Sequence, residues 1–163
     1  LLNEIEGHDL LKNIYEKDPS TCLLMVGDGP YLANLKERYD SHPGIIFTGR
    51  IEREQLPLYY SGAGLFVFPS ETDTFGMVVM EALACGLPAL VTDKGGPKEI
   101  VEDGVTGRII SEQTVEAWQL HMEEMMNRFT TNPFEYERFR MRIFESAEPG
   151  NHWESLIDSL CAN

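Results

Sequence analysis

Short apolar runs alternate with amphipathic segments along most of the chain. The apolar runs fall at residues 21–26, 44–49, 65–69, 87–92 and 107–110. Such short runs are typical of strands that are buried on both faces of a parallel sheet. The segments between them have the spacing of helices or the Gly, Pro and Asp of turns. The pattern therefore predicts that strands and helices alternate.

The predicted helices lie between these strands, with a further one before the first strand. They cover residues 10–15, 30–39, 52–63, 75–85 and a short turn of helix after 97. Pro30 fits the first position of its helix, Pro57 lies near the start of the next or kinks it, and Gly86 ends the fourth. Short connections between parallel strands predict a Rossmann-like α/β fold, with helices on both faces of the sheet. Ligands in such folds bind beyond the carboxyl ends of the strands.

The last third of the sequence has a different pattern. Residues 112–129, 133–147 and 151–162 all have helical spacing, and their aromatic and Met residues are interpreted as packing surface. We expect one domain over residues 1–163, with an α/β core at 1–111 and a helical tail at 112–163. Because the chain starts without Met and enters a helical pattern at once, we expect it to be part of a longer protein.

Composition and charge narrow the possible partners. The chain has 163 residues, which suits one compact domain, and its net charge is −14. This charge argues against nucleic acid and anionic membranes as partners, but not against a small phosphorylated ligand. The three cysteines have no metal-binding spacing, and we expect Cys22 and Cys85 to be buried, reduced thiols of a cytoplasmic protein. No metal site, cofactor or membrane insertion is expected.

Two carboxylates raise the question of function. Glu81 is the only charged residue between Phe75 and Val91, and Asp73 precedes it by eight positions. A buried carboxylate needs hydrogen-bond donors. Glu81 could pair with a cation or turn outward, or it could accept hydrogen bonds from the two adjacent hydroxyls of a ribose. Asp73 could cap the helix that follows or contact a ligand.

The start of that helix is a candidate anion site. Residues 74–78 cross from loop to helix, where the first N–H groups have no helical partner and the helix dipole favours negative charge. Gly76 would let a ligand approach the backbone closely. A nucleotide sugar could place its ribose on Glu81, its diphosphate at the helix N-terminus and its sugar near Asp73.

These residues resemble those of a known enzyme family. The segment PSETDTFGMVVMEALACGLPALVTDKGGPKEIVEDGVTGRII is similar to the donor-binding half of family 4 GT-B retaining glycosyltransferases. Upstream, LLMVGDGP and IIFTGRIEREQLPLYYSGAGLFVFPS match in order and spacing, as does the final NHWESLIDSL. The matched positions are Asp73, Phe75, Gly76, Glu81, Gly86, Pro88, Gly95, Gly96 and Glu99.

The resemblance implies a role for individual residues. Glu81 would hold the ribose hydroxyls, and Asp73 would contact hydroxyls of the donor sugar as the catalytic-site carboxylate. The backbone of Thr74, Phe75, Gly76, Met77 and Val78 would meet the sugar and the diphosphate. The Gly95–Gly96 loop would pack beside this donor loop, although a structural turn explains the two glycines equally well. The base would lie near Gly27, Arg50 and Ile51, although a plain turn and a surface arginine would explain Gly27 and Arg50 equally well. Lys94, Lys98 and Arg108 are expected near the ligand edge, unless they balance an acidic surface.

The sequence departs from the family pattern in three respects. Asp73 stands where the family has Glu, so its carboxylate is one methylene shorter. Glu4 or Glu6 falls where the family has a phosphate-binding Lys, and a glutamate there would repel a diphosphate. The family's N-terminal domain, which supplies the acceptor site, is not in this sequence.

The resemblance implies transfer of a hexose from a UDP- or GDP-sugar to an acceptor hydroxyl, with retention and without a metal. The acceptor would be a saccharide or a lipid-linked group bound through the N-terminal domain, in a cytoplasmic or membrane-peripheral protein. This chain alone is expected to be inactive. Two alternatives stay open, namely a non-catalytic nucleotide-sugar-binding module and a GT-B nucleotide-sugar epimerase.

Overall fold

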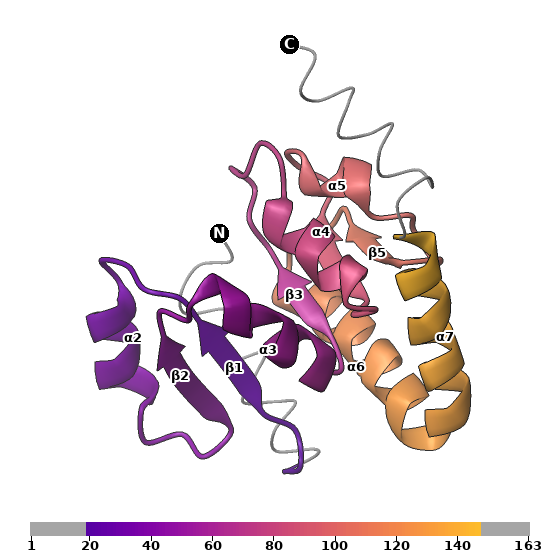
Figure 1. Ribbon diagram of the computed structural model, residues 1–163. Helices are drawn as coiled ribbons and strands as arrows, with labels where there is room; N and C mark the ends of the chain where they lie inside the picture. Colours follow the sequence, from indigo (N-terminus) through magenta and orange to yellow (C-terminus); the bar gives the residue numbers. More distant parts are fainter. Residues whose placement is uncertain (1–18, 148–163) are drawn as a thin grey trace. The chain divides into compact units, whose positions relative to one another are not determined.

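The computed structural model describes residues 19–147. These residues form two compact units that meet in sequence between Leu56 and Pro57. Figure 1 shows the helices and strands of both units. The predicted helices at residues 10–15 and 151–162, together with Glu4 and Glu6, lie outside the described residues.

The described part of the first unit, residues 19–56, contains two parallel strands and an α-helix. β1 (Leu23–Val26) pairs with β2 (Ile45–Gly49), and between them lies α2 (Leu32–Tyr39). The 3₁₀ turn η1 (Arg53–Gln55) follows β2.

Two expectations for this first unit are wrong. Pro30 does not begin α2, because the Leu32 N–H donates to the Gly29 carbonyl at 3.1 Å and Pro30 lies inside that turn. Cys22 is exposed rather than buried, because it precedes the first paired residue of β1.

The second unit is built on three parallel strands. β3 (Phe66–Phe68), β4 (Ala89–Thr92) and β5 (Gly107–Ile110) lie in the order β3-β4-β5, with β4 in the centre. All four residues of β4 are buried, as a strand covered on both faces requires. The helices are α3 (Leu56–Gly62), α4 (Met77–Ala84), α5 (Pro97–Ile100), α6 (Val115–Thr131) and α7 (Pro133–Ser146).

The core of this unit lies where the helices meet the sheet. α4 packs on β3 and β4, α6 packs on β5, and α7 packs on α4 and α6 (Figure 1). Val79, Ala82 and Leu83 of α4 have no exposed surface, and neither has Trp118 of α6. The apolar character of residues 75–91 is therefore explained by packing.

Residues of α7 hold two loops together through backbone carbonyls. The Arg140 guanidinium donates to the Gly86 carbonyl at 3.1 Å, to the Ala63 carbonyl at 3.0 Å and to the Ser61 carbonyl at 2.9 Å. The Tyr136 hydroxyl donates to the Gly64 carbonyl. These contacts tie the end of α3 and the end of α4 to the last described helix.

The predicted parallel α/β class is confirmed, and most strand and helix positions agree within two residues. The strands form two separate ladders rather than one, with β1-β2 in the first unit and β3-β4-β5 in the second. The predicted division into a core to residue 111 and a tail stays a prediction. No helix between residues 19 and 147 is long and apolar enough to cross a membrane.

Candidate functional site

The loop after β3 is organised by Asp73. Its Oδ1 atom accepts the Phe75 N–H at 2.9 Å and the Gly76 N–H at 2.5 Å. The carboxylate therefore caps the turn that leads into α4, which is the role that aspartate commonly has at a helix start. Both bonds are made by Oδ1, and neither involves the second carboxylate oxygen, Oδ2.

Gly76 is the residue at which the chain turns into α4. Its φ of +80° lies in the left-handed region that favours glycine. A Cβ added there would lie 2.9 Å from Cδ1 of Ile100 and 3.1 Å from Cα of Pro97. Gly76 is thus required both for the turn and for the close packing of α4 against α5.

The first turn of α4 presents two open backbone donors. Met77 and Val78 are its first two residues, and their N–H groups have no acceptor among residues 19–147. This follows from helix geometry, because the first N–H groups of a helix have no intrahelical partner. Met77 is 52% exposed, so the start of α4 is open to solvent. A negatively charged group could bind there.

The Gly95–Gly96 loop packs directly on the loop that carries Asp73. The Gly96 N–H donates to the Asp73 carbonyl at 3.0 Å. A Cβ on Gly95 would collide with the Asp73 carbonyl oxygen, and a Cβ on Gly96 would collide with that of Thr74. The expectation that these glycines pack beside the loop at residues 73–76 is confirmed, and the donor-binding role of that loop stays a prediction.

Glu81 lies one turn into α4 and is half-buried. The Tyr60 hydroxyl, on α3, donates to its Oε2 atom at 3.3 Å. Burial and the neighbouring Glu81 carboxylate raise the pKa of Tyr60 to about 12. The same two causes raise the pKa of the Cys85 thiol, which is half-buried where burial was expected.

The role of Tyr60 was not predicted from the sequence. Tyr60 lies within the helix predicted at residues 52–63, and no motif there indicates a chemical role for it. The contact joins residues 21 positions apart. It depends on the packing of Tyr60 against Phe66 of β3, the strand on which α4 also packs. The available signal was a tyrosine, with a polar tip on an apolar body, in the helix before β3.

The other predicted site residues lie in the first unit. Gly27 follows β1, and its N–H donates to the Gly49 carbonyl at 2.9 Å. Arg50 and Ile51 follow β2; the first is exposed and the second is half-buried. The structure thus brings Gly27 close to the start of the Arg50–Ile51 segment, at the carboxyl ends of two neighbouring strands. Whether they bind a base stays a prediction.

The three cations expected near the ligand edge all face carboxylates. Lys94 lies 3.4 Å from Asp93, and Lys98 lies 3.9 Å from Glu99. These pairs agree with the alternative that the cations balance an acidic surface.

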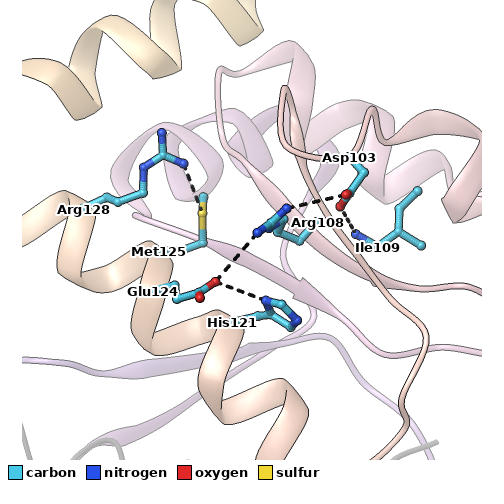
Figure 2. Close-up of polar contacts among 7 residues, drawn as sticks. All are labelled: Asp103, Arg108, Ile109, His121, Glu124, Met125 and Arg128. Atoms are coloured by element: carbon cyan, nitrogen blue, oxygen red, sulfur yellow. Dashed lines mark hydrogen bonds and ion pairs between the residues drawn. The ribbon is translucent and has the colours of Figure 1, made fainter.

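The position expected for Arg108 is wrong. Arg108 is the second residue of β5, so it lies toward the amino end of the strand rather than the carboxyl end. Its guanidinium faces Asp103 at 3.5 Å and Glu124 at 3.9 Å, as Figure 2 shows. His121 contacts Glu124 at 3.3 Å from the same helix (Figure 2). A cavity of about 510 Å³ beside Arg108, Glu124 and Arg128 is therefore not at the α4 edge.

Comparison with known proteins identifies the family. Residues 3–138 match the sequence model of the family described as "Glycosyl transferases group 1". The chain belongs to this family. The resemblance seen in the sequence is thus confirmed, and it extends over most of the chain.

Several relatives within this group 1 family are transferases by name. The chain is 35% identical over 111 residues to the sulfoquinovosyl transferase SQD2 of Arabidopsis thaliana, which covers 66% of this chain and 22% of that protein. It is 35% identical over 127 residues to the GDP-mannose-dependent alpha-(1-6)-phosphatidylinositol monomannoside mannosyltransferase of Mycolicibacterium smegmatis, which covers 69% of this chain and 33% of the relative. The chain therefore spans about a third or less of each relative.

Solved structures agree on the fold of this group 1 domain. The pneumococcal O-GlcNAc transferase GtfA, in complex with UDP and GlcNAc, matches 99% of this chain and 34% of its own with a TM-score of 0.72 at 19% identity. Sucrose-phosphate synthase from Thermosynechococcus elongatus matches 99% of this chain and 42% of its own with the same TM-score of 0.72 at 25% identity. The chain has the fold of one half of a GT-B glycosyltransferase.

Proposed function

We propose that the chain is the donor-binding half of a retaining glycosyltransferase. The full protein would move a hexose from a UDP- or GDP-sugar to an acceptor hydroxyl. One observation carries this proposal, namely the arrangement of groups at the start of α4. Asp73 orders the turn before the helix, the N–H groups of Met77 and Val78 have no helical partner, and Glu81 follows one turn later. Membership of the group 1 family supports the same reading.

In this proposal the ribose binds Glu81. Its half-buried carboxylate has two oxygens that can accept hydrogen bonds from two adjacent hydroxyls. The diphosphate binds the N–H groups of Met77 and Val78, where the positive end of the helix dipole adds to the attraction. As the bond to the sugar breaks, negative charge grows on the diphosphate, and fixed backbone donors stabilise that charge.

Asp73 would contact the donor sugar through Oδ2, since Oδ1 is engaged with Phe75 and Gly76. Its role would be to orient the sugar, and it is not proposed as a nucleophile. Thr74 and Phe75 would border the sugar and the diphosphate. An aspartate that caps the turn is held in one orientation, which favours a fixed contact over a flexible one.

The base and the acceptor would be bound by residues outside α4. Gly27, Arg50 and Ile51 are proposed to border the base. The acceptor would be a saccharide or a lipid-linked group bound by an N-terminal domain outside this sequence. The lipid in the name of the mycobacterial relative supports a lipid-linked acceptor.

Cytoplasmic localisation is proposed from the free thiols of Cys22 and Cys85.

A thermal-shift panel tests the proposal. The chain is melted alone and with UDP, GDP, ADP, their hexose forms and NAD, beside Glu81→Gln and the exposed control Glu102→Gln. Ligand at about 100 times its dissociation constant should add about 2.7 kcal/mol to the free energy of unfolding. We expect one nucleoside diphosphate to stabilise the chain and the control but not Glu81→Gln. Equal stabilisation of both variants would contradict the assignment of Glu81.

A further inference from the structure

We infer that Tyr60 is a positioning residue, which holds the Glu81 carboxylate in the orientation that recognises the ribose of the donor. This inference rests on the proposed function, because it deepens the role given to Glu81. Nothing in the sequence pattern assigned a role to Tyr60, and the contact comes from the structure.

The geometry joins two elements that are distant in sequence. Tyr60 is in the last turn of α3, Glu81 is in the middle of α4, and the hydroxyl donates to Oε2 at 3.3 Å. Both residues are half-buried and belong to the same compact unit. The bond therefore fixes one carboxylate oxygen from outside the helix that carries it.

The Tyr60 ring is itself held in place. It packs edge-on against Phe66 with ring centroids 5.8 Å apart, and Phe66 stacks on Phe68 at 5.9 Å. Both phenylalanines belong to β3, the strand that leads to the Asp73 loop. Edge-to-face aromatic pairs fix ring orientation as well as burying area. Tyr60 therefore links β3 to Glu81, because its ring packs on Phe66 and its hydroxyl bonds to the carboxylate.

The protonation state of Tyr60 suits a donor. Burial, and then the adjacent Glu81 charge, raise the pKa of Tyr60 to about 12. The phenol therefore keeps its proton throughout the physiological pH range, and its O–H remains a hydrogen-bond donor to the carboxylate.

The role of Tyr60 can be tested with nucleotides that differ in their ribose hydroxyls. If Tyr60 orients Glu81, its loss should weaken binding through the ribose hydroxyls and leave other contacts unchanged. A purely structural tyrosine would instead affect every ligand equally, through the stability of the unit. Nucleotides that lack the ribose hydroxyls separate these two cases.

The experiment compares Tyr60→Phe with the neighbouring control Tyr59→Phe, whose parent side chain is 36% exposed. Dissociation constants of UDP, GDP and ADP, and of their 2′,3′-dideoxy forms, are measured by calorimetry on the 163-residue chain, with Glu81→Gln and the double variant. Labelled tyrosine is used in parallel to titrate Tyr60 by NMR. Phenylalanine keeps the ring against Phe66, so the fold should be retained.

We expect Tyr60→Phe to weaken the ribonucleotide about tenfold, which corresponds to about 1.4 kcal/mol. The dideoxy form should bind wild type and Tyr60→Phe alike, and Tyr60→Phe should add little to Glu81→Gln, because the two residues act together. The Tyr60 pKa should fall in Glu81→Gln. Unchanged ribonucleotide affinity in Tyr60→Phe, with binding to wild type intact, would overturn the inference and leave the proposed function standing. If wild type binds none of the three, the proposed function fails and the inference with it, whatever the Tyr60 titration shows.

Discussion

The Gly96 N–H donates to the Asp73 carbonyl at 3.0 Å, so the turn before α5 is bonded to the turn before α4. Both turns follow neighbouring strands of one parallel sheet, at the carboxyl ends where ligands of such sheets bind. The contact leaves no space for a side chain at position 96, because a Cβ would collide with the Thr74 carbonyl. The backbone conformation of the candidate site thus depends on a glycine that need not touch the ligand.

Gly96→Ala should therefore disturb the Asp73 loop. We expect a loss of about 1–3 kcal/mol in the free energy of unfolding, as for other overpacked sites, together with weaker nucleotide binding. Gly64→Ala is the matched control, because a Cβ there would meet nothing within 4 Å. Urea denaturation of both variants measures the difference. Equal stability of the two would show that the loop can move away at little cost.

The cap made by Asp73 can be separated from any contact with the sugar. Asp73→Ala removes the acceptor of two N–H groups and should cost about 1 kcal/mol of stability, whereas Asp73→Asn keeps an oxygen acceptor and should cost less. If Asp73 also orients the sugar through Oδ2, Asp73→Asn should weaken a nucleotide sugar more than the free nucleoside diphosphate. Calorimetric titration of both ligands decides this, and equal effects on them would leave Asp73 as a cap alone.

Sequence patterns correctly predicted the features that depend on neighbouring residues along the chain. The strand positions follow from the short apolar runs, and the end of α4 follows from Gly86, whose φ of +69° only glycine adopts readily. The Gly95–Gly96 contact came from family resemblance. Local patterns failed where contacts between distant residues decide. Neither the Tyr60–Glu81 bond nor the carbonyls bound by Arg140 could be read from spacing, because they depend on the packing of several elements.

Arg140 is expected to be a main contributor to stability. Arg140→Ala would remove donors from the Gly86, Ala63 and Ser61 carbonyls at once. Loss of these bonds should lower the free energy of unfolding by about 2–3 kcal/mol. Arg142→Ala, two positions along on an exposed part of α7, should change it little. Thermal or urea denaturation distinguishes them, and similar losses in both would mean that removal of charge, not of these bonds, is responsible.

Stability should fall at high pH through Tyr136. Burial raises its pKa to about 12, from a usual value of 10.0 in the unfolded chain. Its contribution is fully present below pH 10 and is lost as pH rises toward 12, because the unfolded state then releases a proton that the folded state keeps.

Tyr136→Phe is the test of this dependence. It also loses the bond to the Gly64 carbonyl, so it should be less stable than wild type near neutral pH. Phenylalanine does not titrate, so the difference in free energy of unfolding between the two proteins should narrow as pH rises from about 10 to about 12. Urea denaturation at several pH values measures it, and a constant gap would contradict the raised pKa.

The central claim is that a nucleoside diphosphate binds at the start of α4. The most direct measurement is an NMR titration of the ¹⁵N-labelled chain with UDP, GDP and ADP, which follows every assigned backbone amide. We predict that one of them shifts the Met77 and Val78 amides most, and that Glu81→Gln abolishes the shifts. Shifts centred instead on Gly104, Arg108 and Arg128, which line the cavity of about 510 Å³, or no shifts with any of the three, would contradict the account.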